Sequence, residues 1–236
     1  MQLSKLENQA YETLRNNSVY LFEIRDLSLI LNINKTKTYN LIKALKKKKA
    51  IEKIGKGKFM LKEANEYEIA SEINSPSYIS FISALNYYGF SDQMPRKIYL
   101  SSLKYSKELD KFKFITLSKH RFFGYTKIGN IVIAEKEKVI LDSLLFPKYS
   151  LGIKEVERSL VRSISELDLK KLFDYAIKMN SKSVLRRLGY ILEKINIKNK
   201  EINKIRNHIG KGYELLDPSI KRKNNLNKRW LLDINI

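Results

Sequence analysis

The residues whose types and spacing suit binding chemistry lie between Lys35 and Lys58. Basic, amide and hydroxyl side chains recur in this stretch, and such side chains bind phosphates and base edges. If Thr38, Ile42 and Leu45 face a core at helical spacing, the outward positions are mostly basic or polar. The candidate DNA-binding residues are Lys35, Thr36, Lys37, Tyr39, Asn40, Lys43, Lys47, Lys56 and Lys58.

Two roles are expected within this set. The lysines suit phosphate contacts, whereas the amide of Asn40 can pair with adenine in the major groove. Lys56 and Lys58 are predicted at the tip of a hairpin, where they would touch the neighbouring phosphates. A small helical domain with a solvated lysine face is the alternative. The order of the surrounding elements favours DNA binding.

The predicted order of these elements is helix, turn, helix and two-stranded hairpin. Arg25 to Leu31 and Lys35 to Lys47 carry apolar residues at helical spacing, and Asn34 stands where an N-cap belongs. Ile51 to Ile54 and Lys58 to Leu61 are predicted to pair as a hairpin across a glycine-containing turn. The segment before Arg25, from Val19 to Phe22, could add a third strand. This order is that of a winged helix-turn-helix, whose second helix enters the major groove.

Composition restricts the remaining possibilities. The chain has 236 residues and a net charge of +21, which points to a polyanionic partner, and the basic excess is concentrated at its two ends. There is no cysteine, and the two histidines, His120 and His208, are far apart, so no metal site is expected. Neither a membrane span nor a secretory signal is apparent, which favours a cytoplasmic protein. Without a phosphate loop or an acid–base pair, we expect no enzymatic activity and no cofactor.

The rest of the chain predicts a second domain. Ser4 to Asn16 reads as the first helix, and Lys62 to Ser75 as a polar, partly helical connector with few apolar anchors. Strands and then helices follow, which is typical of an α+β fold. The expected strands are 98–101, 113–117 and 131–134, and the expected helices are 78–88, 135–146, 153–163, 168–179 and 183–195. The predicted domains are therefore 1–62 (winged helix-turn-helix), 63–75 (connector), 76–196 (mixed α+β with a helical C-terminal part) and 197–236 (basic C-terminal extension).

A scattered set of small and apolar residues between Leu6 and Leu192 resembles the AbiEi family of antitoxins. The matching residues are Ser77–Ser80, Ser83–Leu85, Gly89, Gln93, Pro95, Lys97–Leu100, Phe122–Gly124, Ile131–Ala134, Glu137, Lys138, Leu141 and Asp142. Two positions depart from the family pattern: Lys136 stands where many relatives have proline, and Val139 where alanine is usual. The basic tail lies outside the resemblance.

This resemblance implies an antitoxin of a type IV toxin–antitoxin pair, a predicted regulator of viral defence. Such a protein opposes a nucleotidyltransferase-like toxin, with no stable complex required, and represses its own operon. The implied partners are double-stranded operator DNA and the cognate toxin, with possible self-association on DNA. Two alternatives remain open. One is a stand-alone winged-helix transcription regulator whose second domain senses a ligand or dimerises, and the other is an RNA-binding accessory protein.

Three further expectations concern particular acidic and aromatic side chains. Asp142 is expected to be a solvated or capping acid, because that is the ordinary role of such a residue. Glu135 and Glu137 are expected to point to different sides of a helix and so to make a poor carboxylate pair. Trp230, in the basic tail, could stack on nucleic acid, but packing back on the body is the favoured interpretation.

Overall fold

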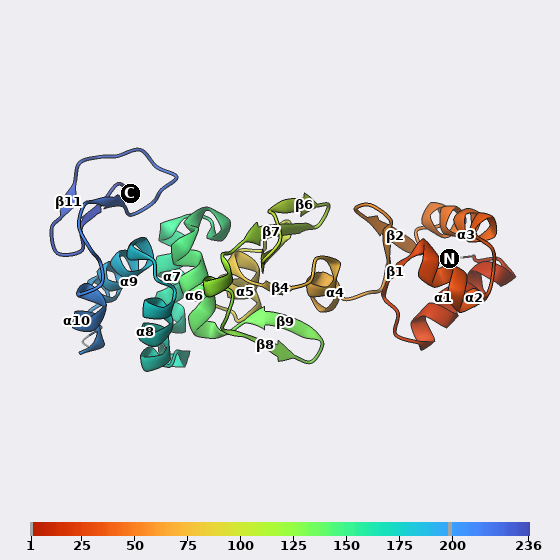
Figure 1. Ribbon diagram of the computed structural model, residues 1–236, viewed down its shortest axis with the longest axis horizontal. Coiled ribbons are helices and arrows are strands. Elements are labelled where there is room, and N and C mark those ends of the chain that lie inside the picture. The colour runs from red at the N-terminus through yellow and green to blue at the C-terminus, as the bar shows by residue number, and fades with distance from the viewer. Residues whose placement is uncertain (1, 198–199) are drawn as a thin grey trace.

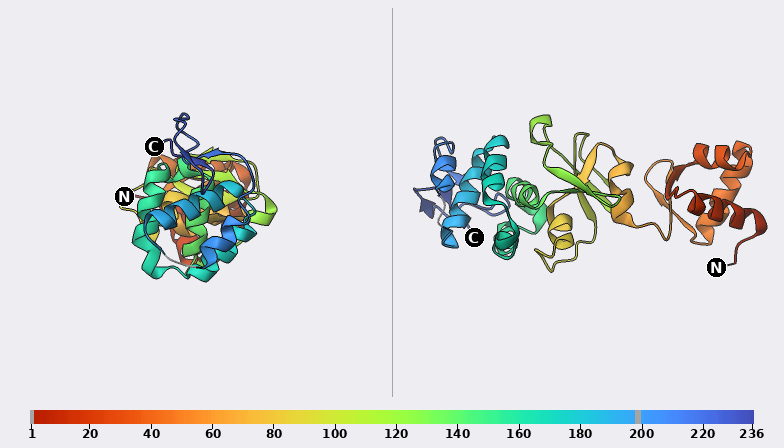
Figure 2. Two further views of the ribbon diagram at one scale, coloured as in Figure 1. Left: turned by 90° about the vertical axis from the view of Figure 1, so that its left-hand side faces the viewer. Right: turned by 90° about the horizontal axis from the view of Figure 1, so that it is seen from below.

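The computed structural model describes residues 2–197 and 200–236, which form ten α-helices and three sheets in a mixed α+β fold. The molecule is elongated: its N-terminal part, a central sheet and a helical C-terminal part follow one another along the long axis (Figure 1). Figure 2 shows that this arrangement persists when the molecule is turned about the horizontal axis. No helix in the described residues is both long and apolar enough to cross a membrane.

The N-terminal part is a set of three helices and a three-stranded antiparallel sheet. Its elements are α1 (Lys5–Asn16), β1 (Leu21–Glu23), α2 (Ile24–Leu31), α3 (Lys35–Lys47), β2 (Ile51–Ile54) and β3 (Lys58–Leu61). The sheet order is β1-β3-β2, so the predicted third strand is confirmed. Ser4 and Glu7 form a reciprocal capping box at the start of α1. Asn32 ends α2 in the left-handed conformation, and the Asn34 side chain caps α3.

The central part is a six-stranded mixed sheet with the order β6-β7-β5-β4-β9-β8. Its strands are β4 (Ser77–Ile79), β5 (Ile98–Ser102), β6 (Lys107–Leu109), β7 (Phe112–Thr116), β8 (Tyr125–Ile128) and β9 (Ile131–Ala134). Helix α4 (Glu66–Ile73) lies on one side of the sheet, and α5 (Phe81–Tyr87) and α6 (Lys136–Leu145) lie on the other (Figure 1).

The C-terminal part contains the helices α7 (Ile153–Ser163), α8 (Leu169–Lys178), α9 (Lys182–Lys194) and α10 (Glu201–Arg206). The first three pack on α6, and α10 packs on α8 and α9. Short 3-10 turns are η1 (Lys119–Arg121), between β7 and β8, and η2 (Pro147–Ser150) and η3 (Ile164–Glu166), on either side of α7. The tail adds a small sheet from β10 (Glu214–Leu215), β11 (Leu226–Asn227) and β12 (Leu232–Asp233), ordered β10-β12-β11.

The tail is fastened to the body by Trp230. Its ring is fully buried, and its Nε1 donates to Glu193 Oε2 at 2.7 Å. A Cβ added at Gly189 of α9 would lie 2.1 Å from the indole, so only glycine leaves room for this ring. The interpretation that Trp230 packs back on the body is confirmed.

Two segments differ from the sequence prediction. The stretch predicted as one helix from Tyr78 to Tyr88 is strand β4 followed by α5. Tyr78 and Ile79 are buried because β4 is central in the sheet, and a short strand buried on both faces has no period that separates it from a helix. The connector is also better anchored than expected, since α4 buries Ile69, Ala70 and Ile73. The sequence did not predict the edge strands β6 and β8.

The N-terminal part meets the central sheet through few contacts, several of them polar. Lys111 Nζ lies 2.8 Å from Glu52 Oε2 in β2 and 2.5 Å from Glu66 Oε1 in α4. Hydrogen bonds to these two carboxylates raise the pKa of Lys111 to about 12. The β2–β3 turn also approaches β6, because a Cβ added at Gly55 would lie 3.0 Å from Leu109.

Candidate nucleic-acid interface

Helix α3 presents one buried and one exposed face. Thr38, Leu41, Ile42 and Leu45 are buried, as the helical spacing predicted. Thr38 satisfies its hydroxyl by donating to the backbone carbonyl of Asn34 at 2.9 Å. The register of α3 is therefore fixed by three apolar side chains and one internally bonded threonine.

The opposite face of α3 carries most of the predicted binding residues. Tyr39 is 60% exposed, and its neighbours on that face are exposed as well. These residues are Lys35, Thr36, Lys37, Tyr39, Asn40, Lys43 and Lys47. Within residues 2–197 and 200–236, none of the four lysines in this set has an ion-pair partner. By contrast, Lys48 just beyond the helix pairs with Glu7 at 2.6 Å.

A groove of about 540 Å³ separates α3 from the β2–β3 hairpin. Tyr39 and Lys43 line it from α3, and Gly57 and Phe59 line it from the hairpin. Lys46 and Lys53 also line this groove and are exposed, although the sequence prediction did not include them. Lys46 was hidden in a run of four lysines, and the position of Lys53 depends on how the hairpin packs beside α3. Nothing in the sequence pattern specifies that packing.

The two remaining candidates occupy different surroundings. Lys56 is exposed at the turn of the hairpin, whose flanking Gly55 faces Leu109 of the central part. Lys58 is only half-exposed, and its Nζ donates to the backbone carbonyl of Ile73 at 3.2 Å. The structure therefore directs Lys58 toward the end of α4.

This arrangement has the chemistry of a polyanion-binding surface. Unpaired ammonium groups can neutralise phosphates, and the exposed amide of Asn40 offers both a donor and an acceptor to a base edge. Three acids of the N-terminal part pair with bases outside α3: Glu7 with Lys48, Glu52 with Lys111, and Glu63 with Arg15. The lysines of α3 and of the groove therefore form a local excess of positive charge.

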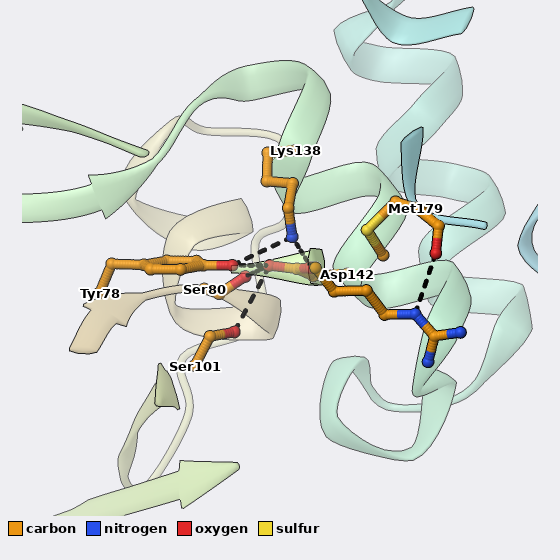
Figure 3. Close-up of polar contacts among 7 residues, drawn as sticks. Tyr78, Ser80, Ser101, Lys138, Asp142 and Met179 are labelled. Carbon is orange, nitrogen blue, oxygen red and sulfur yellow. Dashed lines mark hydrogen bonds and ion pairs between the residues drawn. The ribbon is translucent and has the colours of Figure 1, made fainter. Parts of the chain in front are cut away.

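The central part contains a buried polar network (Figure 3). Lys138 and Asp142, one turn apart on α6, are both fully buried and form an ion pair. The Asp142 Oδ2 atom accepts from Tyr78 Oη at 3.0 Å, from Ser80 Oγ at 2.8 Å and from Ser101 Oγ at 3.4 Å. The expectation that Asp142 is solvated or caps a helix is therefore wrong, because its hydroxyl partners come from β4, from Ser80 directly after β4 and from β5, all remote in sequence.

Burial dominates the electrostatics of this network. It lowers the pKa of Lys138, although Asp142 opposes that effect, and it raises the pKa of Tyr78 well above the ordinary value. The Lys138 ammonium also lies 5.2 Å from the centroid of the Phe123 ring, within cation–π range. Since Lys138, Asp142 and Tyr78 have no solvent-accessible side chain, the network joins α6 to the sheet and does not form an open site.

The carboxylates of Glu135 and Glu137 converge, contrary to expectation. Lys171 Nζ on α8 lies 3.3 Å from an oxygen of each. The helical-spacing argument fails because Glu135 is the N-cap of α6 and has extended backbone angles. Its neighbour Lys136 occupies the first helical position, where proline is common in helices. Among the residues described, no group of three or more acidic, histidine or cysteine side chains could hold a metal ion.

Comparison with known proteins places the chain by fold alone. No family model matches the sequence, and no curated protein matches it. Among solved structures, the fold is similar to that of the RV2827C protein from Mycobacterium tuberculosis. The TM-score is 0.68 at 11% sequence identity, and the match covers 98% of this chain and 92% of that one. The two chains therefore share an architecture that extends over nearly their whole lengths.

Proposed function

We propose that this protein binds duplex DNA through residues 1–62 and represses transcription from its own operon. The observation that carries the proposal is the exposed face of α3, whose lysines have no ion-pair partner within the described residues. An unpaired basic surface of this kind is an electrostatic footprint for nucleic acid. In this proposal the N-terminal part is a winged helix-turn-helix, with α2 and α3 as the two helices and β2–β3 as the wing.

The proposed binding mode inserts α3 into the major groove. Asn40 would then contact a base edge, and Lys43, Lys46 and Lys53 would contact the phosphates beside the groove that separates α3 from the hairpin. Duplex DNA is favoured over structured RNA because the A-form major groove is too deep and narrow for side chains to read.

We further propose that the protein is the antitoxin of a type IV pair and acts in the cytoplasm. The support is the resemblance of Ser77–Ser80, Phe122–Gly124, Glu137, Lys138, Leu141 and Asp142 to AbiEi antitoxins. Four of these residues, Tyr78, Ser80, Lys138 and Asp142, belong to the buried network, so a shared scaffold accounts for part of the resemblance. The opposed toxin would be a nucleotidyltransferase-like enzyme encoded beside this gene.

Specific DNA binding with a steep salt dependence is the first expected result. If about five phosphates are neutralised, the logarithm of affinity should fall against the logarithm of salt concentration with a slope of about −4.5. The measurement compares the DNA upstream of the gene with a scrambled fragment of equal length, by fluorescence anisotropy from low to high salt. Equal affinity for the two fragments would contradict sequence-specific binding.

Asn40→Ala and Lys43→Ala are expected to weaken DNA binding in different ways. Asn40→Ala should cost about 1–3 kcal/mol on the operator and little on random DNA, because only base reading is lost. Lys43→Ala should weaken binding to both DNAs similarly and reduce the salt slope by about one unit. Lys154→Ala on α7, far along the molecule from α3, is the matched control (Figure 1). The same pattern for Asn40→Ala and Lys43→Ala would show that α3 docks in another register.

A further inference from the structure

A second basic pocket lies in the C-terminal part, far from α3. It has a volume of about 540 Å³ and is enclosed by the end of α6, the α8–α9 turn and the tail after β10. Its lining includes three cationic side chains and three hydroxyls. These are Arg121, Lys148, Arg187, Ser181, Ser183 and Ser219. Cations and hydroxyls gathered in one hollow can bind an oxyanion.

Arg187 is the central feature of this pocket. Its side chain is buried, with 4% of the residue exposed, and it donates to the carbonyls of Leu144 at 2.7 Å and Leu215 at 3.1 Å. Its Nε has no hydrogen-bond partner in the part of the chain that the structure describes. Burial lowers the pKa of Arg187, although the nearby carboxylates of Glu214 and Asp217 oppose that effect. A buried guanidinium bonded only to neutral carbonyls is stabilised by an anion beside it.

The N-terminal end of α9 lines the same pocket. Ser181 is the N-cap residue of this 13-residue helix, but its side chain makes no capping hydrogen bond. Its Oγ lies 3.0 Å from Ser183 Oγ instead. The first-turn amides of α9 therefore lack their usual side-chain acceptor, and the positive end of the helix dipole adds to the cationic character of the pocket.

The remaining lining residues add a further cation, an acid and apolar surface to the pocket. Arg121 is held by bonds from Nε to the Met179 carbonyl at 2.9 Å and from Nη2 to the Asn180 carbonyl at 3.2 Å, which leaves its Nη1 for a ligand. The acid at the rim, Glu214, has its Oε1 3.4 Å from Arg186 Nη1. Phe146 and the neighbouring Leu145 and Pro147 also line the pocket and give it apolar surface. The pocket thus combines cationic groups with apolar side chains.

We propose that this pocket binds the phosphate group of a small phosphomonoester. The phosphate would lie among Arg121, Lys148 and the first turn of α9, and would offset the buried charge of Arg187. The body of the ligand would rest on the apolar surface at Phe146. This site is separate from α3, and the proposal does not depend on DNA binding or antitoxin activity.

Calorimetric titration of the full-length protein at constant ionic strength tests the proposal. The probes are AMP, inorganic phosphate and adenosine. AMP and inorganic phosphate are expected to bind with one-to-one stoichiometry, and adenosine is expected not to bind. Tighter binding of AMP than of phosphate supports an organic phosphomonoester as the ligand. Phosphate that binds as tightly as AMP, adenosine that binds as tightly as AMP, or AMP that does not bind would overturn the proposal.

Variants then locate the site. Lys148→Glu is expected to reduce the affinity for AMP at least about tenfold, since a charge-assisted contact is replaced by repulsion. Ser183→Asp should do the same, because its carboxylate would occupy the first turn of α9 in place of the ligand. Lys154→Glu changes the net charge equally outside the pocket and should leave the affinity within about twofold, as should Lys43→Ala on α3.

All of these side chains except Ser183, which is half-exposed, are exposed, so folding should be retained. Unchanged affinity in Lys148→Glu, or an equal loss in Lys154→Glu, would overturn the proposal.

Discussion

Asp142→Ala is expected to destabilise the protein by about 3–5 kcal/mol, because it leaves the Lys138 ammonium buried without a carboxylate. The hydroxyls of Tyr78 and Ser80 lose their acceptor in the same change. Urea unfolding followed by the fluorescence of Trp230 measures the effect. This residue is the only tryptophan and is buried against α9, so its signal reports unfolding of the C-terminal part.

Two further variants separate the charge effect from ordinary packing. Asp92→Ala removes an exposed partner of Arg162 and should cost no more than about 1 kcal/mol. The double variant Lys138→Met with Asp142→Leu removes both charges at similar volume and should recover much of the lost stability. If Asp142→Ala costs no more than Asp92→Ala, or if the double variant is no more stable than Asp142→Ala, the buried pair does not stabilise the fold in this way.

The residues that the sequence predicted well are those whose environment is local. The stripe on α3, the cap at Asn34 and the hairpin after α3 each depend on neighbours within a few positions, so periodicity and turn chemistry specify them. Helix α6 was predicted for the same reason, with Glu135 at its start.

The features that the sequence did not predict depend on partners remote in the chain. Asp142 is buried because Tyr78 and Ser101, 64 and 41 residues away, supply hydroxyls to it. Strand β4 was mistaken for the start of a helix because it is buried on both faces in the middle of the sheet. The place of Lys53 in the groove follows from the packing of the hairpin beside α3.

The same distinction applies to the connector. Ile69, Ala70 and Ile73 form a short apolar set whose significance is visible only once α4 lies on β4 and β9. By contrast, ion pairs of half-exposed Lys111 contribute to the contact between the N-terminal part and the central sheet, and such pairs stabilise weakly. The structure therefore attaches α4 to the central sheet more firmly than it attaches residues 1–62.

A fragment of residues 62–236 is accordingly expected to fold, to rescue cells that express the cognate toxin and to fail to bind the operator. It retains α4 and loses the contacts of α4 with β1 together with the polar and turn contacts at β2 and β3. A fragment that begins at Asn74 should be less stable by several kcal/mol, because it exposes the surface that Ile69 and Ile73 cover, at about 1.5–3 kcal/mol for each large side chain. Circular dichroism compares the folding of the two fragments, and survivor counts measure rescue.

The outcome decides how the two proposed activities are divided along the chain. Full-length Asn40→Ala and Lys43→Ala should rescue as well as the unmodified protein, because the proposal gives α3 no part in opposing the toxin. If the 62–236 fragment is folded and gives no rescue while the full-length protein does, residues 1–61 are needed for neutralisation. If neither rescues, and no toxin gene lies beside this one, the antitoxin proposal is wrong and a stand-alone regulator remains. Specific operator binding by the full-length protein would stand in either case, since it depends on α3 and the groove beside it.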